Sequence, residues 1–131
     1  MQPDAAATAA ERTAFSQINA HRASKGLPAL AWSDVIAEQA RRHSREMASG
    51  ETPRGHAGYE ARMAAIAKHI RFNSAAENVV GDRDVEAAVR RLLLSPVHRK
   101  NIEEDFDLTG VGAATGGDGL LYLTQIFVKT E

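Results

Sequence analysis

The sequence predicts an α+β domain in which helices pack in layers against a small, mostly antiparallel sheet. Three observations support this class. Apolar residues recur at helical spacing in several segments before residue 95. A short apolar run over residues 75–80 is typical of a strand, and the end of the chain alternates around a Gly-rich turn. The predicted order is helix, helix, loop, helix, strand, helix, short helix, strand, strand.

The composition indicates one ordinary globular domain. Of the 131 residues, 44% are hydrophobic and 25% are charged, and the formal charge is −1. That charge excludes partners held by bulk electrostatics, such as nucleic acid. The chain has no cysteine, hence no disulfide and no thiol nucleophile. We expect a mobile segment over 1–7, a single domain over 8–131, and a monomer.

Two helices are predicted in the first part of the chain. The first runs from about Thr8 to Ser24, and the second from Asp34 to Ser49, with Ser33 as its cap and Gly50 as its end. His43 lies on the apolar stripe of the second helix, and we interpret it as a core histidine with satisfied hydrogen bonds rather than a ligand.

Asn19 and Arg22 share one face of the first helix. They are either surface polar residues or the residues that tie this helix to the following loop. That loop, GLPALAW, contains a proline and three large apolar residues, so we expect an extended segment lying across the domain.

Two candidate functional residues lie in the middle of the chain. His56 falls in the Gly- and Pro-containing loop 51–59, where it is either exposed and idle or held for a purpose. A third helix is predicted over about 59–70, followed by the strand 75–80, which contains Glu77. A carboxylate buried in a strand needs a partner, either backbone N–H groups or an arginine.

The stretch SPVHRKNI follows a fourth helix, which begins at Asp82 or Asp84 and ends at about Leu94. It predicts a short helix with Ser95 as its cap, a proline at the first position and His98 at the third. Helix dipoles there favour neutral imidazole near pH 7, which can accept a proton or bind a metal. The competing interpretation is that Ser95 only caps and His98 only packs locally.

A hairpin is predicted at the end of the chain, with strands LTGVGAAT and LLYLTQIFVK joined by GGDG. The glycines of GVGAATGG could suggest a phosphate-binding loop. A strand and a turn follow them rather than a helix, so we reject that interpretation.

Several short motifs together resemble the CAP superfamily, also called SCP-like. In order they are N-x-x-R in INAHR, GLPALAW, A-x-x-H-S-x-x-M in ARRHSREM, AEN, SPVHRKNI, GVG and Y-x-T-Q-x-F. The resemblance extends from Phe15 to Val128. It implies a cysteine-free bacterial type with a three-layer α-β-α sandwich and an open cleft.

The resemblance also implies a set of cleft residues. His56 matches the histidine of the loop after the second helix, Glu77 the glutamate of the E-N motif, and His98 the second histidine. Ser95 stands where a second acidic residue is expected, so the fourth member is missing. Leu92 replaces a usual Trp and Val97 a usual Gly, which changes the shape expected for the cleft.

Three functions are compatible with these residues. In the first, a cleft with His56, Glu77, Ser95 and His98 binds a small or extended ligand, hydrophobic or peptide-like, with zinc or another divalent cation on His56 and His98 and Glu77 in support. The second is a peptidase-like hydrolase with a histidine base and water or Ser95 as nucleophile. The third is a structural or interaction module. Whether the protein is an enzyme is left open at this point.

The resemblance implies secretion or a location in the periplasm or cell envelope. The N-terminal MQPDAAATAA lacks a basic start followed by an apolar core, so we expect no signal peptide within it. No run of apolar residues has the length of a membrane-spanning helix.

Overall fold

The computed structural model describes residues 8–131, and the segment 1–7, expected to be mobile, lies outside the described residues. The elements are α1 (Ala9–Ser24), β1 (Ala31–Trp32), α2 (Asp34–Ser49), α3 (Tyr59–Ala67), β2 (Phe72–Asp82), α4 (Val85–Leu94), α5 (Pro96–Glu103), β3 (Leu108–Thr115) and β4 (Leu121–Thr130). Within this described part of the chain, no helix has the length and apolarity needed to span a bilayer.

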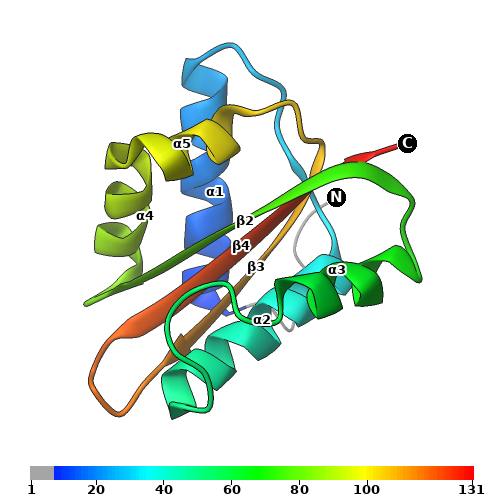
Figure 1. Ribbon diagram of the computed structural model, residues 1–131. Helices are drawn as coiled ribbons and strands as arrows, with labels where there is room; N and C mark the ends of the chain where they lie inside the picture. The colour runs from blue at the N-terminus through cyan, green and yellow to red at the C-terminus, as the bar shows by residue number, and fades with distance from the viewer. Residues whose placement is uncertain (1–7) are drawn as a thin grey trace.

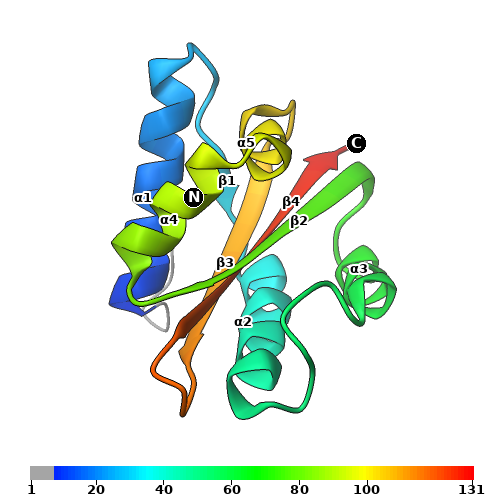
Figure 2. The same cartoon turned by 60° about the vertical axis from the view of Figure 1, so that its left-hand side comes forward.

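The fold has three layers, as the resemblance implies. The sheet has the strand order β1-β3-β4-β2. The β1–β3 pair is parallel, and the β2–β4 and β3–β4 pairs are antiparallel. Helices α1, α4 and α5 cover one face of the sheet, and α2 and α3 cover the other (Figures 1 and 2). The prediction of an α+β sandwich with a mostly antiparallel sheet is therefore confirmed.

Local capping signals explain why the first two long helices lie where the sequence predicts. The Thr8 side chain accepts a hydrogen bond from the Glu11 amide, and Glu11 accepts one in return from the Thr8 amide. Ser33 caps α2, and Gly50 ends it in the left-handed conformation at φ 84°. In contrast, α3 stops at Ala67, before the predicted residue 70, and β2 is longer than predicted at both ends.

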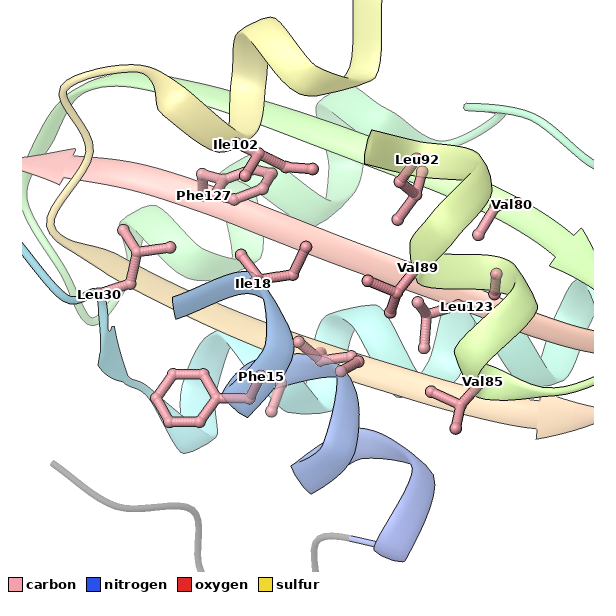
Figure 3. Packing of buried hydrophobic residues seen from close by; sticks show 14 of the residues in the cluster. Phe15, Ile18, Leu30, Val80, Val85, Val89, Leu92, Ile102, Leu123 and Phe127 are labelled. Carbon is pink, nitrogen blue, oxygen red and sulfur yellow. The ribbon is translucent and has the colours of Figure 1, made fainter. Parts of the chain in front are cut away.

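Of three hydrophobic clusters in the described residues, the two larger ones hold the layers together. The larger lies between the sheet and α1, α4 and α5, and Figure 3 shows Ile18, Val89, Leu92 and Phe127 pointing into it. Its only tryptophan, Trp32, is fully buried and meets Phe15 edge-on at 5.3 Å between ring centroids. The smaller cluster joins α2 and α3 to the other face of the sheet.

Glycines of the GVG motif let α2 lie directly on β3. A Cβ atom at Gly110 would lie 2.2 Å from the Ala37 backbone nitrogen, and one at Gly112 would lie 2.1 Å from the Arg41 backbone nitrogen. Neither position can hold a side chain without moving the helix. These glycines therefore serve close helix–sheet packing, in agreement with the rejection of a phosphate loop.

Asn19 and Arg22 tie α1 to its surroundings, which decides between the two interpretations of these residues. Asn19 both donates to and accepts from the backbone of Leu30. Arg22 is 1% exposed. Its guanidinium donates to backbone carbonyls at Pro28, Ile102, Glu104 and Phe106. One side chain thus fixes the loop after α1 and the segment between α5 and β3.

Candidate functional site

Glu77 lies near the middle of β2 and is held by two partners. Its side chain is 1% exposed. Arg62, on α3, donates from Nε to Oε2 and from Nη2 to Oε1, both at 2.7 Å. The Nδ1 atom of His56 lies 2.8 Å from Oε1. Of the two partners considered for a buried Glu77, the arginine is the one found, in the two-pronged geometry that stabilises a carboxylate most strongly.

The contacts of Arg62 continue to His43, which makes a buried chain of polar groups from α2 to β2. Nη1 of Arg62 donates to the Ala57 carbonyl at 2.7 Å and lies 3.1 Å from Nδ1 of His43. Nε2 of His43 lies 2.7 Å from the Gly55 carbonyl. Because the guanidinium can only donate and the carbonyl can only accept, His43 is the neutral tautomer with its proton on Nε2. Its interpretation as a satisfied core histidine is confirmed.

His98 lies on the first turn of α5, at the third helical position as predicted. Its Nδ1 atom is 2.9 Å from Oγ of Ser95, and its backbone carbonyl accepts from Asn78 Nδ2 at 3.0 Å. Ser95 occupies the N-cap position, but its hydroxyl makes no capping hydrogen bond. The prediction that capping accounts for this hydroxyl is wrong, because the imidazole three residues later takes its place as partner.

His56 and His98 line one open pocket of about 380 Å³. The lining consists of Arg54, Gly55, His56, Val79, Val80, Gly81, Arg91 and His98. The loop before α3 contributes one side, α4 and α5 the other, and β2 the floor. Residues far apart in the sequence are thus brought together at the edge of the sheet.

Burial lowers the pKa of His98, and the neighbouring His56 lowers it further because two imidazolium charges repel each other. The sequence predicted neutral His98 from the helix dipole. The direction agrees, but burial and His56 are the causes. The His56 side chain is 52% exposed, so its ring is open to solvent on the side away from Glu77.

The pocket is lined by cationic and neutral groups, and none of its lining residues is acidic. Arg54 makes a long hydrogen bond, 3.4 Å from Nη1 to the Gly81 carbonyl, and its charge helps to lower the pKa of Asp118, which lies outside the lining. Arg91 is paired with Asp82 at 2.8 Å, and that carboxylate lies outside the lining. A ligand entering here meets two guanidinium groups and two imidazoles.

The four predicted cleft residues come together only in part. His56 and His98 share the pocket, and Glu77 lies behind His56. Ser95 lines a neighbouring hollow of about 410 Å³ and reaches His98 from there. Of the two departures noted in the sequence, Leu92 is buried in the core and Val97 is 73% exposed, and neither lines the pocket.

The pocket contains two imidazoles, which are of the side-chain type that binds divalent metals, and the carboxylate of Glu77 is already occupied by protein partners. In each ring Nδ1 has a protein partner, Glu77 for His56 and Ser95 for His98, so Nε2 is the ring nitrogen that could bind a metal. Both oxygens of Glu77 are used by Arg62 and His56, so Glu77 orients His56 as an outer-shell carboxylate orients a metal-binding histidine. In the described residues, no group of three or more acidic, histidine or cysteine side chains is arranged for a metal.

Sequence reasoning missed Arg62, whose pairing with Glu77 spans 15 residues. A signal was available. Arg62 and Ile66 lie one turn apart and form the buried face of α3. A cation on an apolar stripe, in a chain with a buried strand carboxylate nearby, indicates a buried ion pair.

A family model decides the wider relationship. The CAP model, described as the cysteine-rich secretory protein family, matches residues 15–127. The chain belongs to the CAP family. It is a member without cysteine. No protein among those with curated descriptions matches this CAP domain.

Solved structures share the fold of this CAP domain. An outer surface protein of Borrelia burgdorferi has a TM-score of 0.82 at 20% identity, with all of both chains covered. An extracellular SCP-domain protein of Bacillus anthracis has a TM-score of 0.74 at 27% identity over 92% of this chain and 40% of that one. NaASP2 with Zn²⁺ has a TM-score of 0.62 at 11% identity, over 97% and 83%. The chain therefore spans the whole of the first and two fifths of the second.

Proposed function

We propose that this CAP domain is an extracytoplasmic binding module that takes a small ligand with an anionic group between His56 and His98. The observation that carries the proposal is the pocket lining, which has two guanidinium groups, two imidazoles and no carboxylate. The one hydrogen bond of Arg54 is long, and its charge also acts on Asp118, which lies outside the lining; its guanidinium is the type of group that binds a carboxylate or phosphate with two hydrogen bonds. The similar proteins named as extracellular and outer-surface support a location outside the cytoplasm.

A divalent cation such as zinc is the second component of the proposal. His56 and His98 would hold it through Nε2, Glu77 would fix the His56 ring, and the anionic ligand with water would complete the coordination. The similar structure of NaASP2 was solved with Zn²⁺, which supports metal binding by a protein of this fold. Because the protein supplies two donors beside two arginines, the metal alone should bind weakly and an anion should strengthen its binding.

A histidine-resolved NMR titration with sodium acetate, then with zinc sulfate, tests both components. We expect His56 and His98 to shift together and saturably with acetate, and Arg54→Gln to weaken that response. The matched control is Arg45→Gln, an exposed arginine on α2. With zinc, the two rings should again respond together, and His98→Asn should remove the effect.

The acetate and zinc steps of this titration test anion binding and metal binding separately. If acetate leaves both rings unchanged, the anionic-ligand proposal is wrong, and the module would act through its surface instead. If zinc shifts only His21 and His69, which lie outside the pocket, the metal assignment is wrong.

One observation favours a hydrolase as a second candidate. His56 has Nδ1 on a buried carboxylate and its other nitrogen on the open side, which is the arrangement of a general base. Ser95 is poorly placed as nucleophile because it lines the neighbouring hollow. Release of amines or carboxylates from a peptide and ester panel, lost in His56→Gln, would support this function. No turnover in the wild type, with and without zinc, would exclude it for that panel.

A hydrophobic ligand is favoured by a different feature. A hollow of about 450 Å³ between α1 and α4 is lined by four apolar residues, Ala20, Val89, Leu93 and Leu94, together with Gln17, Glu86 and Arg90. A lipid tail fits such a groove better than it fits the polar pocket. Octanoate titration distinguishes the sites. Shifts at Ala20 and Leu93 amides would indicate the groove, and shifts confined to His56 and His98 would indicate the carboxylate alone.

A further inference from the structure

The floor of the pocket is the free edge of the sheet. In the strand order β1-β3-β4-β2, the strand β2 is terminal and pairs only with β4. Figures 1 and 2 show it as the outermost strand, with α4 and α5 on one side and α3 on the other. Three consecutive β2 residues, 79–81, line the pocket.

The register shows which backbone groups of β2 face the pocket. The carbonyl of Leu120, directly before β4, accepts from the Gly116 amide, directly after β3, and the carbonyl of Val128, on β4, accepts from the Asp107 amide, directly before β3. Even-numbered β4 positions therefore face β3, because backbone polar groups alternate sides along an antiparallel strand. Val79 and Gly81 stand opposite two such positions, Thr124 and Tyr122. Their N–H and C=O groups must point away from β4, into the pocket.

An independent contact supports this direction. The Gly81 carbonyl accepts from Arg54, a residue of the pocket wall. The intervening residue, Val80, pairs with Leu123 and directs its polar groups to β4. The pocket floor thus offers two sets of strand donors and acceptors, at Val79 and Gly81, with the spacing of an added strand.

We infer that the ligand of this pocket is an extended peptide that adds to β2 as a further strand and places a carboxylate against Arg54 and Arg91. This inference rests on the proposed function and names its ligand class. Main-chain hydrogen bonds to Val79 and Gly81 hold the peptide in register. The absence of acidic residues from the lining is complementary to a carboxylate, from either the peptide C-terminus or an acidic side chain. Arg54 leaves the Gly81 carbonyl, where a peptide N–H replaces it.

Amide hydrogen exchange on the whole domain tests the inference. The probe is the peptide Ac-Ala-Val-Ala-Val with a free carboxylate, and sodium acetate is the matched small anion. We expect the peptide to slow exchange at the Val79 and Gly81 amides about fivefold when its concentration is about four times its Kd. Acetate should not slow it. Val80, already bonded to β4, should change less.

Three further probes identify the contacts. A peptide N-methylated at alternate residues should lose the protection at Val79 and Gly81. Ac-Ala-Val-Ala-Val amide should bind more weakly, and Ac-Ala-Asp-Ala-Val amide should recover affinity if an acidic side chain is the source of the carboxylate. Arg54→Gln should weaken the free acid and spare the amide, and Arg45→Gln should change neither.

The outcomes are distinguishable from failure of the proposed function. If both peptide and acetate shift His56 and His98 while Val79 and Gly81 stay unprotected, strand addition is wrong and anion binding stands. If the N-methylated peptide protects as well as the parent, strand addition is also wrong. If neither peptide nor acetate affects the histidines or β2, both proposals are overturned.

Discussion

Arg62 holds Glu77 through two hydrogen bonds of 2.7 Å, one to each carboxylate oxygen, and both side chains are buried, at 8% and 1% exposure. This contact joins α3 to β2 and leaves Oε1 in contact with His56. The buried pair therefore has two effects. It fixes the edge strand against a helix, and it orients the imidazole that lines the pocket.

Removing the guanidinium should be costly. Arg62→Gln leaves a buried carboxylate without its counter-charge, and we expect a loss of about 3–5 kcal/mol in the free energy of unfolding. Urea denaturation measures the loss. Arg45→Gln, on the exposed face of α2, should stay within about 0.5 kcal/mol.

A double variant shows whether the cost comes from the orphaned charge. Arg62→Met with Glu77→Met should be considerably more stable than Arg62→Gln, because neither partner is left charged. A loss below about 1 kcal/mol for Arg62→Gln would mean that the pair contributes little.

The pH dependence of stability should carry a contribution from His98. Burial and His56 lower its pKa in the folded state, so the unfolded chain binds the proton more tightly. The contribution is fully favourable above the unfolded pKa of about 6.5 and is lost as the pH falls from there toward the folded pKa. Unfolding titrations should show a decline over this window that is smaller in His98→Gln. NMR should show the His98 pKa rising in His56→Gln, and an unchanged value would contradict their proximity.

Close packing at the GVG motif should make it intolerant of even a methyl group. In Gly112→Ala the new Cβ would lie 2.1 Å from the Arg41 backbone nitrogen, so α2 must move. We expect a loss of about 3 kcal/mol or more, at the upper end for overpacking. Gly117→Ala is the control, because nothing lies within 4 Å of its Cβ. Equal thermal midpoints for the two variants would show that the α2–β3 contact yields easily.

Asp84 and Ser95 occupy the N-cap positions of α4 and α5, and replacing each by alanine should change stability by different amounts. Asp84 caps α4 through the Ala87 amide, so Asp84→Ala should cost about 1 kcal/mol. Ser95 makes no such bond, so Ser95→Ala should cost less than about 0.5 kcal/mol. Its effect should instead appear in the ring ¹⁵N shifts of His98, which loses its partner. A loss comparable to that of Asp84→Ala would restore the capping interpretation.

The sequence predicts features that depend on a few neighbouring residues. The bounds of α2 follow from Ser33 and Gly50, and the place of His98 follows from the proline that starts α5. The start of β2 was missed because Phe72 and Ser74 flank an irregularity in the pairing with β4, which no alternation pattern marks.

The site was less predictable, because its contacts depend on distance in space. The resemblance to the CAP family brought His56 and His98 together. The pairing of Arg62 with Glu77 crosses from α3 to β2, and its one local signal, a cation on the buried face of α3, does not identify the carboxylate that it meets. At Ser95 the N-cap rule predicted a backbone amide of α5 as the partner of the hydroxyl. The partner is the His98 imidazole, which lies within the same helical turn. Capping statistics do not rank a backbone amide against an imidazole at that distance.

Arg22 joins segments that lie far apart in the sequence without a covalent cross-link. Four carbonyl contacts from this one side chain close two loops around the end of α1. These four hydrogen bonds form when the chain folds and break when it unfolds. Unlike a disulfide, they need no oxidant to form and no disulfide isomerase to correct them. Because the chain has no cysteine, neither this link nor any other contact of the domain depends on a thiol–disulfide potential, and no mispaired disulfide can form.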